Sequence, residues 1–258
     1  MKCDKFPVVV MLASVVMVFL AGTAQAVPLK GQLGILDMGA NGGVNPATGV
    51  PWAEGDQYRF AFHTSERTTA QSSDISTYNA WVQGLADTST AYNIGANDGA
   101  TWKAIGSTDT VDARDNTATN PNVETGHAIF LLDGSSVVAN DYADLWDGEI
   151  QNVINLTEQG TTWAHWPFTG TNKDGTAASG PQFGSLGNPI NGNVTQGQAS
   201  VATNWIWRTW TGDPPDTELP MYALSDPLTV EVIPEPTTFV IWTLLAGLGI
   251  GLGRRRRK

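Results

Sequence analysis

Closely spaced carboxylates are the first side chains in this sequence whose type and spacing suit a reaction. Asp147 and Glu149 lie two residues apart, directly after Trp146. Glycoside hydrolysis uses two carboxyl groups that flank the scissile bond, so this pair is the best candidate for such an activity. Because 23 acidic residues lie between residues 27 and 233, close pairs also arise by chance. A solvated turn explains Asp147 and Glu149 more simply.

Four tryptophans form a second candidate group. Trp163 and Trp166 are three residues apart, and Trp205 and Trp207 are two apart. Residues two apart in a strand share a face, so Trp205 and Trp207 would point the same way. Exposed indoles offer a flat surface to a sugar or a protein, whereas buried ones would pack the core of a domain without cysteine. With the carboxylate pair, these indoles make up the candidate ligand surface.

Other patterns that carry catalysis or metal binding are missing from the sequence. It has no G-x-S-x-G nucleophile motif, and His63, His127 and His165 are isolated, without an H-E-x-x-H motif. The acidic cluster at 109–116 lacks the spacing of a calcium-binding loop. We therefore predict no catalytic residue, no metal ligands and no cofactor, and calcium has no motif to support it.

The composition of residues 27–233 is typical of one folded, exported domain. This region carries seven basic and 23 acidic residues, a net charge of −16. Nucleic-acid binding needs clustered cations, so nucleic acid is excluded as a partner. The only cysteine, Cys3, lies near the N-terminus, so a disulfide cannot stabilise the domain. Nine of the ten tryptophans lie in the region and argue against disorder.

The C-terminal 25 residues contain three features in a fixed order. Pro234-Glu235-Pro236 comes first, and an uncharged apolar run of 15 residues follows at 239–253. As a helix this run spans about 22 Å, less than the roughly 30 Å hydrocarbon core of a bilayer. Five cations then match the positive-inside rule, which predicts a C-terminus in the cytoplasm. They are Arg254, Arg255, Arg256, Arg257 and Lys258.

This order of features resembles the bacterial PEP-CTERM sorting signal. In that family a membrane-embedded cysteine protease of the exosortase class recognises Pro-Glu-Pro and cuts near it. The resemblance therefore assigns recognition to Pro234, Glu235 and Pro236. Each proline favours extended backbone, which suits a protease cleft. The alternative is an ordinary tail anchor that is never cut.

The N-terminus has the pattern of a secretory signal peptide. Two lysines precede an apolar run at 7–22, and Ala24 and Ala26 supply small residues two apart. Cleavage after Ala26 by signal peptidase would make Val27 the first residue of the mature protein. An uncleaved membrane anchor is the alternative.

The chain therefore divides into four parts. We expect a signal peptide at 1–26, a loop-rich lead-in at 27–56, an ectodomain at 57–232 and a sorting signal at 233–258. The sorting signal comprises a hydrophobic helix at 239–253 and a basic tail at 254–258.

The ectodomain reads as short strands with one clear helix. Asp74 is a candidate N-cap, and Ile75, Tyr78, Val82 and Leu85 have helical spacing, which predicts a helix ending near 84–86. A second short helix or turn is expected at 99–105, and a strand in the lead-in near 33–36. Alternation of residue types predicts strands at 57–65, 221–224 and 228–232. An apolar run predicts a strand at 127–132, and a return strand is expected to begin at 137–138 after a turn at 133–134.

The order of these elements resembles the endostatin-type variant of the C-type-lectin-like fold. Phrases such as Thr-Trp-Lys-Ala-Ile-Gly-Ser-Thr at 101–108 and Ile-Phe-Leu-Leu-Asp-Gly at 129–134 carry the resemblance. It implies an α+β domain over 57–232 that pairs its first and last strands, with two helices early and a long irregular region late. Such relatives usually carry disulfides, which this chain lacks. An all-β sandwich or jelly roll is the alternative.

These patterns predict an exported, exosortase-processed protein of the cell surface or extracellular matrix, with a non-catalytic ectodomain. The membrane would hold it before processing, and exopolysaccharide or surface proteins are the expected ligands. A purely structural matrix component is one alternative. A secreted polysaccharide hydrolase that uses a carboxylate pair is the other.

Overall fold

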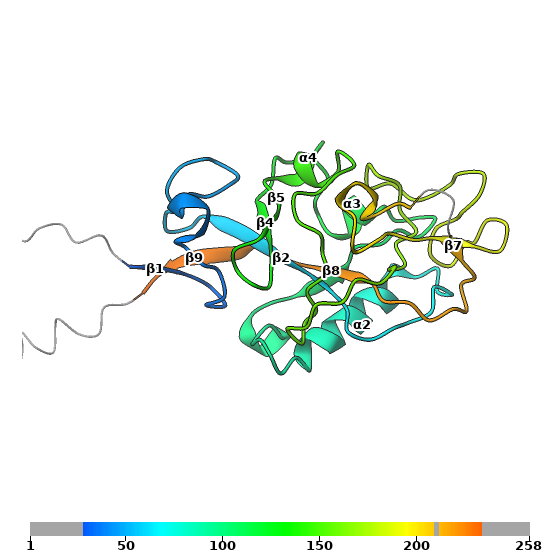
Figure 1. The fold of residues 1–258 in the computed structure, drawn as a ribbon, viewed down its shortest axis with the longest axis horizontal. Coiled ribbons are helices and arrows are strands. Elements are labelled where there is room, and N and C mark those ends of the chain that lie inside the picture. Colours follow the sequence, from blue (N-terminus) through cyan, green and yellow to red (C-terminus); the bar gives the residue numbers. More distant parts are fainter. Residues whose placement is uncertain (1–27, 209–211, 234–258) are drawn as a thin grey trace, which may run out of the picture. The chain divides into compact units, whose positions relative to one another are not determined.

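A computed structural model describes residues 28–208 and 212–233 of the chain (Figure 1). The chain divides into two units, one of residues Leu29–Glu231 and one of Met1–Pro28 with Val232–Lys258. The predicted signal peptide at 1–26 and the predicted hydrophobic helix at 239–253 lie outside the described residues. So do Ala24, Ala26, the Pro-Glu-Pro motif and the basic tail. Within the described ranges, no helix combines the length and hydropathy needed to cross a membrane.

Strand β2 (Gln57–His63) is the centre of the main sheet. It pairs in parallel with β4 (Ala128–Leu131) on one side. On the other side it is antiparallel to β9 (Leu228–Val232) along its first half and to β8 (Tyr222–Ser225) along its second half. At the break between β8 and β9, the hydroxyl of Ser225 accepts a hydrogen bond from the backbone N–H of Phe60 (3.0 Å). The side chain thus satisfies a buried donor of the central strand.

The remaining strands extend this sheet in antiparallel pairs. β3 (Trp102–Ala104) pairs with β8, β5 (Val137–Ala139) with β4, and β1 (Leu29–Gly31) with β9. A separate ribbon joins β6 (Val194–Thr195) to β7 (Gly212–Asp213). Mostly antiparallel strands with few helices confirm the coarse prediction of fold class.

Helix α2 (Ile75–Asp87) covers one face of the sheet. The Asp74 carboxylate accepts a hydrogen bond from the Ser76 N–H (2.9 Å), the expected N-cap. Tyr78 and Val82 are buried on the helix and join Phe60 of β2 in one core cluster. The helical spacing read from the sequence is therefore confirmed, because the apolar stripe faces the sheet.

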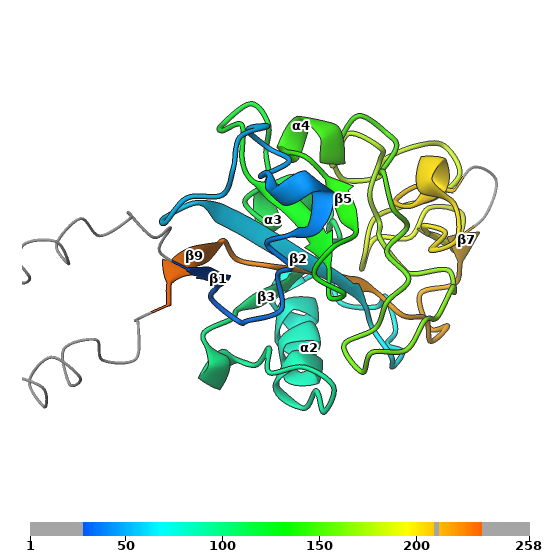
Figure 2. The same cartoon turned by 60° about the vertical axis from the view of Figure 1, so that its left-hand side comes forward.

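A second core cluster lies on the other face of β2. Ala61 of β2 joins residues of α4 (Tyr142–Leu145) and the buried Trp146 and Trp205. Figure 2 shows α2 and α4 on opposite sides of β2, with the short helix α3 (Ala113–Asn116) on the α4 side. Since both faces of β2 are buried, its alternation separates two apolar clusters rather than core from solvent.

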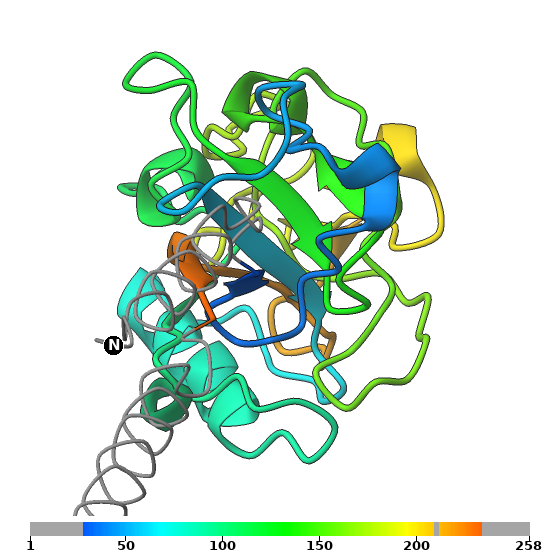
Figure 3. The same cartoon turned by 90° about the vertical axis from the view of Figure 1, so that its left-hand side faces the viewer.

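The lead-in packs against the ectodomain. Its strand β1 joins the sheet, and the buried Trp52 lies 6.2 Å from Phe130 of β4, ring centroid to ring centroid. The backbone N–H of Asp37 donates to the carbonyl of Gly134 in the β4–β5 turn (3.0 Å). Figure 3 shows this blue segment passing beside the green β4–β5 hairpin.

Two local predictions are wrong. The strand expected near 33–36 lies at Leu29–Gly31 instead, because Gly34, at φ 71°, turns the chain. The helix or turn expected at 99–105 is strand β3, which follows a short 3₁₀ turn η3 (Ala96–Asp98). Backbone pairing with β8 overrides the weak helical pattern there. Two further 3₁₀ turns are η2 (Ala40–Gly43) and η4 (Ala202–Asn204).

Candidate functional site

The candidate surface is built on segment 163–168, whose residues 163–167 belong to no helix or strand. The backbone N–H of Trp163 donates to Asn155 (2.7 Å), and that of Phe168 donates to Pro220 (2.9 Å). Between them, the carbonyls of His165 and Pro167 accept hydrogen bonds from Ala199 (3.1 Å) and Gly197 (2.9 Å). Backbone bonds to three other segments therefore hold this segment in place, so its side chains are displayed from a fixed frame.

Trp163 is half-buried between two histidines and an arginine. Its ring centroid lies 5.6 Å from that of His63, at the end of β2, and 4.5 Å from that of His165. The guanidinium of Arg67 lies 5.2 Å from the indole centroid, within cation–π range. The Trp163 indole thus contacts both His63 of the core strand β2 and the exposed guanidinium of Arg67.

The loop that carries Arg67 is fixed by a buried carboxylate. Glu158 is fully buried, and its Oε2 accepts a hydrogen bond from the backbone N–H of Ser65 (3.0 Å). The hydroxyl of Ser65 donates to Oε1 of the same carboxylate. Both side-chain oxygens of the buried acid are thus paired with hydrogen-bond donors, as a buried polar group requires. It also holds the backbone two residues before Arg67.

Trp166 carries the second pair. It is 46% exposed, one of only four large hydrophobic side chains that are exposed in the part of the chain that the structure describes. The guanidinium of Arg208 lies 4.3 Å from its ring centroid, and the Arg208 N–H donates to the carbonyl of Gln196 (2.8 Å). We call Arg67, Trp163, His165, Trp166 and Arg208 the Trp–Arg surface.

Both histidines of this region have lowered pKa values. Burial is the main cause for His63, whose pKa falls to about 4 although its Nδ1 is hydrogen-bonded to the carbonyl of Thr64 (3.0 Å). Partial burial and then the nearby charge of Arg67 lower the pKa of His165. Both rings are therefore neutral at pH 7, and the positive charge of the Trp–Arg surface rests on the two guanidinium groups.

Trp205 and Trp207 do not form an exposed platform, and for Trp205 the structure agrees with the alternative of core packing. Trp205 is fully buried, with its ring centroid 5.6 Å from Trp146 and 5.9 Å from Tyr222. The two residues follow the 3₁₀ turn η4 rather than lying in a strand, so the expected shared face does not form. Trp207 is half-buried and lines a separate cavity of about 280 Å³ with Phe183 and Asn172.

Asp147 and Glu149 lie on an exposed turn. The Asp147 carboxylate accepts a hydrogen bond from the backbone N–H of Glu149 (3.0 Å), so one member of the pair stabilises the turn. Within the described ranges, neither carboxylate makes a hydrogen bond to the tryptophans of the Trp–Arg surface. The solvated-turn interpretation fits this geometry.

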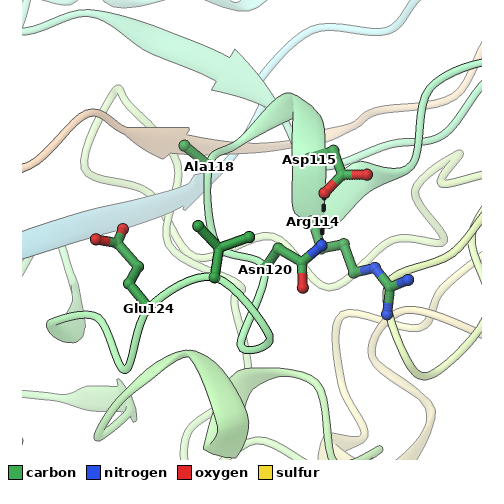
Figure 4. Close-up of a pocket in the computed structure, with 6 residues that line it drawn as sticks. Arg114, Asp115, Ala118, Asn120 and Glu124 are labelled. Carbon is green, nitrogen blue, oxygen red and sulfur yellow. Dashed lines mark hydrogen bonds between the residues drawn. The ribbon is translucent and has the colours of Figure 1, made fainter.

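Two other carboxylates line one cavity of about 230 Å³. Asp115 and Glu124 contribute to its wall with Ala118 and Asn120. Figure 4 shows Asn120 between the two acids in this view, with its amide donating to Asp115 (2.7 Å). Sequence reasoning missed this pair because the two acids lie nine positions apart, which is no short spacing.

Sequence reasoning also missed Arg67 and Arg208. A signal was available, because only seven cations occur in residues 27–233 and Arg208 directly follows the tryptophan-rich phrase 205–207. Contact with Trp163 and Trp166 depends on the fold, however, and no spacing rule gives it.

Comparison with known proteins adds no identification. No protein-family model and no curated protein matches the chain. Across residues 28–208 and 212–233, no group of three or more His, Cys, Asp or Glu side chains is placed to hold a metal ion. The function must therefore be argued from the residues and their geometry.

Proposed function

We propose that this protein is an exported surface or matrix protein whose folded region binds a ligand without catalysis. Signal peptidase would cut after Ala26, and an exosortase-type protease would cut near Pro234, Glu235 and Pro236. The chain would be held by the membrane before the second cut and would reach the cell surface or extracellular space after it.

The observation that carries this proposal is backbone hydrogen bonding between the two segments that lie next to the predicted cleavage sites. The backbone N–H of Ile233 donates to the carbonyl of Pro28 (2.8 Å). The N–H of Gln32 donates to the carbonyl of Thr229 (2.9 Å), which gives the same antiparallel register. Pro28 follows the predicted signal cleavage site by two residues, and Ile233 directly precedes Pro234. Both cuts would fall just outside the paired strands and leave the sheet intact.

The proposal extends to an endostatin-type C-type-lectin-like fold for residues 57–232. Antiparallel pairing of β2 with β8 and β9, the helix α2 after β2, and a mostly irregular stretch from Trp146 to Met221 support it. The early second helix is replaced by η3 and β3, which is a departure from that pattern.

Processing can be tested on the whole chain. We expect mature protein from an exosortase-containing bacterium to begin at Val27 and to lack residues 239–258 by intact-mass spectrometry. Replacing Pro234 and Glu235 by alanine should cause full-length protein to accumulate in the membrane fraction. The matched control is Pro214→Ala with Glu218→Ala, an exposed pair inside the domain. A mature protein that retains residues 239–258 would contradict the proposal.

The cavity with Asp115 and Glu124 favours one second candidate, a polysaccharide hydrolase. In that case Asp115→Asn and Glu124→Gln would each abolish release of reducing sugar from polysaccharide. The exposed pair variant Asp147→Asn with Glu149→Gln is the control. Sugar release that both single variants retain, or that the wild type never shows, argues against this candidate.

A further inference from the structure

The Trp–Arg surface is a cationic site in a strongly acidic domain. Residues 27–233 contain seven basic residues against 23 acidic ones. Three of the seven form ion pairs at 3.6–3.7 Å, and a fourth, Arg59, is 1% exposed. The three ion-paired residues are Lys30, Lys103 and Arg114.

Arg67 and Arg208 differ from these four. Neither has a carboxylate within 4.0 Å in the described part of the chain. Each instead lies on an indole, with its guanidinium 5.2 Å from Trp163 or 4.3 Å from Trp166. The guanidinium N–H groups of Arg67 and Arg208 are thus available to bind a ligand. Contact with the indole rings restricts the conformations of both side chains.

We propose that the Trp–Arg surface binds an acidic polysaccharide, through carboxylates carried on its sugar rings. A planar guanidinium pairs with a carboxylate through two parallel hydrogen bonds. An indole beside it offers a flat, amphipathic surface to the apolar face of the same sugar. This inference rests on the proposed function, because it names the ligand of that non-catalytic domain.

The presence of two tryptophan–arginine pairs favours a polymeric ligand. Trp163 and Trp166 are three residues apart on one segment, so their Cα atoms are at most about 11 Å apart. Each carries its own arginine. Two similar units at this separation suit a ligand that repeats its carboxylates along a chain.

A peptide ligand is less suited to this surface. Extended peptides bind by adding a strand to a free sheet edge. Here the backbone of 163–168 already bonds to Asn155, Gly197, Ala199 and Pro220. A sugar ring needs only the side chains, which remain accessible at Trp166 and Arg67.

The net charge of −16 sets a further limit on the ligand. Outside the two guanidinium groups, the acidic surface repels a densely charged polymer. Carboxylates spaced along the polysaccharide should therefore bind better than closely packed sulfates. Hyaluronan oligosaccharides, with a carboxylate on every second sugar, are a suitable probe, with neutral dextran and heparin as comparisons.

The test measures binding of these probes to the full chain in detergent by calorimetry. We expect hyaluronan oligosaccharides to bind, heparin to bind more weakly and dextran not to bind. Arg67→Gln with Arg208→Gln should lower the affinity roughly tenfold or more, because two charge-assisted interactions are lost. Trp166→Ala should weaken binding, and Arg208→Lys should also do so, since lysine keeps the charge but not the planar fork.

Lys173→Gln is the matched control, a cation that lies against Gly148 and makes no cation–π contact with either tryptophan in the described residues. It should leave the affinity unchanged. Equal binding of dextran, equal binding of polyglutamate, or full affinity in the double arginine variant would each overturn the proposal. Cleavage of the oligosaccharide would instead overturn the non-catalytic function and leave the ligand class standing. Failure to bind, with normal processing at Pro234–Pro236, would overturn the ligand class alone.

Discussion

The imidazole of His63 meets the indole of Trp163 edge to face, with ring centroids 5.6 Å apart. The same imidazole also meets the ring of Tyr222 edge to face, with ring centroids 5.7 Å apart. His63 is fully buried at the end of β2, so its protonation would place a charge between aromatic rings. The Trp–Arg surface is therefore built directly on a group whose charged form is disfavoured in the folded chain.

The stability of the folded chain should decrease as the pH is lowered, because His63 titrates. Its pKa is about 4 in the folded chain and near 6.5 when unfolded, so the unfolded state binds more protons between these values. Folded stability should decrease as the pH falls from about 6.5 to 4, by a total of ~3 kcal/mol. Urea unfolding of wild type and His63→Asn across this range measures it. The difference between the two should shrink at low pH, and parallel curves would contradict the assignment.

Two tryptophans that look equivalent in the sequence should differ strongly in their effect on stability. Trp205→Ala removes a fully buried ring between Trp146 and Tyr222 and should cost about 3–5 kcal/mol of unfolding free energy. Trp166→Ala removes a ring that is 46% exposed and should cost well under half of that. Thermal and urea unfolding of both variants check the contrast. Similar losses would show that the burial of these rings is misassigned.

The sequence revealed those parts of the fold that depend on local patterns. The cap at Asp74 and the spacing of Tyr78 and Val82 fixed helix α2, because its core-facing stripe is encoded within a few turns. The burial of Trp205 depends instead on Trp146 and Tyr222, which are distant in the chain. No spacing rule predicts such a contact in an irregular region, so exposed and buried indoles could not be told apart.

Prediction of the candidate site was limited in the same way, because its contacts join residues that are distant in the sequence. The indoles Trp163 and Trp166 were found by residue type, whereas their partners Arg67 and Arg208 come from other segments. The carboxylate pair chosen by spacing, Asp147 and Glu149, forms only a local turn, because residues two apart in sequence bond to each other most easily.

Helix α2 offers a stabilising substitution at Gly84. This residue is exposed, and a Cβ built on it would meet nothing within 4 Å. Alanine lowers the entropy of the unfolded chain and favours helix, so Gly84→Ala should stabilise the protein by about 0.5–1 kcal/mol. Differential scanning calorimetry should show a higher Tm. Gly31→Ala, at a crowded glycine, should move the Tm in the opposite direction.

Gly31 lies in β1, the strand that pairs with β9 next to the predicted processing site. A Cβ at this position would come within 2.5 Å of the Tyr58 hydroxyl and 2.9 Å of the Leu36 Cβ. Tyr58 is fully buried and cannot swing aside. Gly31→Ala should therefore push β1 away from the sheet and cost about 1–3 kcal/mol.

Hydrogen exchange on the full chain can show which segments lose stability in Gly31→Ala. Because Ile233 bonds to Pro28 and Gln32 bonds to Thr229, loosening β1 should speed exchange at both strands together. Peptides covering 28–36 and 228–233 should exchange faster in Gly31→Ala, while those covering α2 should not change. Gly180→Ala, where a Cβ meets nothing within 4 Å, is the control. Faster exchange in 28–36 alone would mean that β9 keeps its place without β1, and that the two chain ends are not protected as a pair.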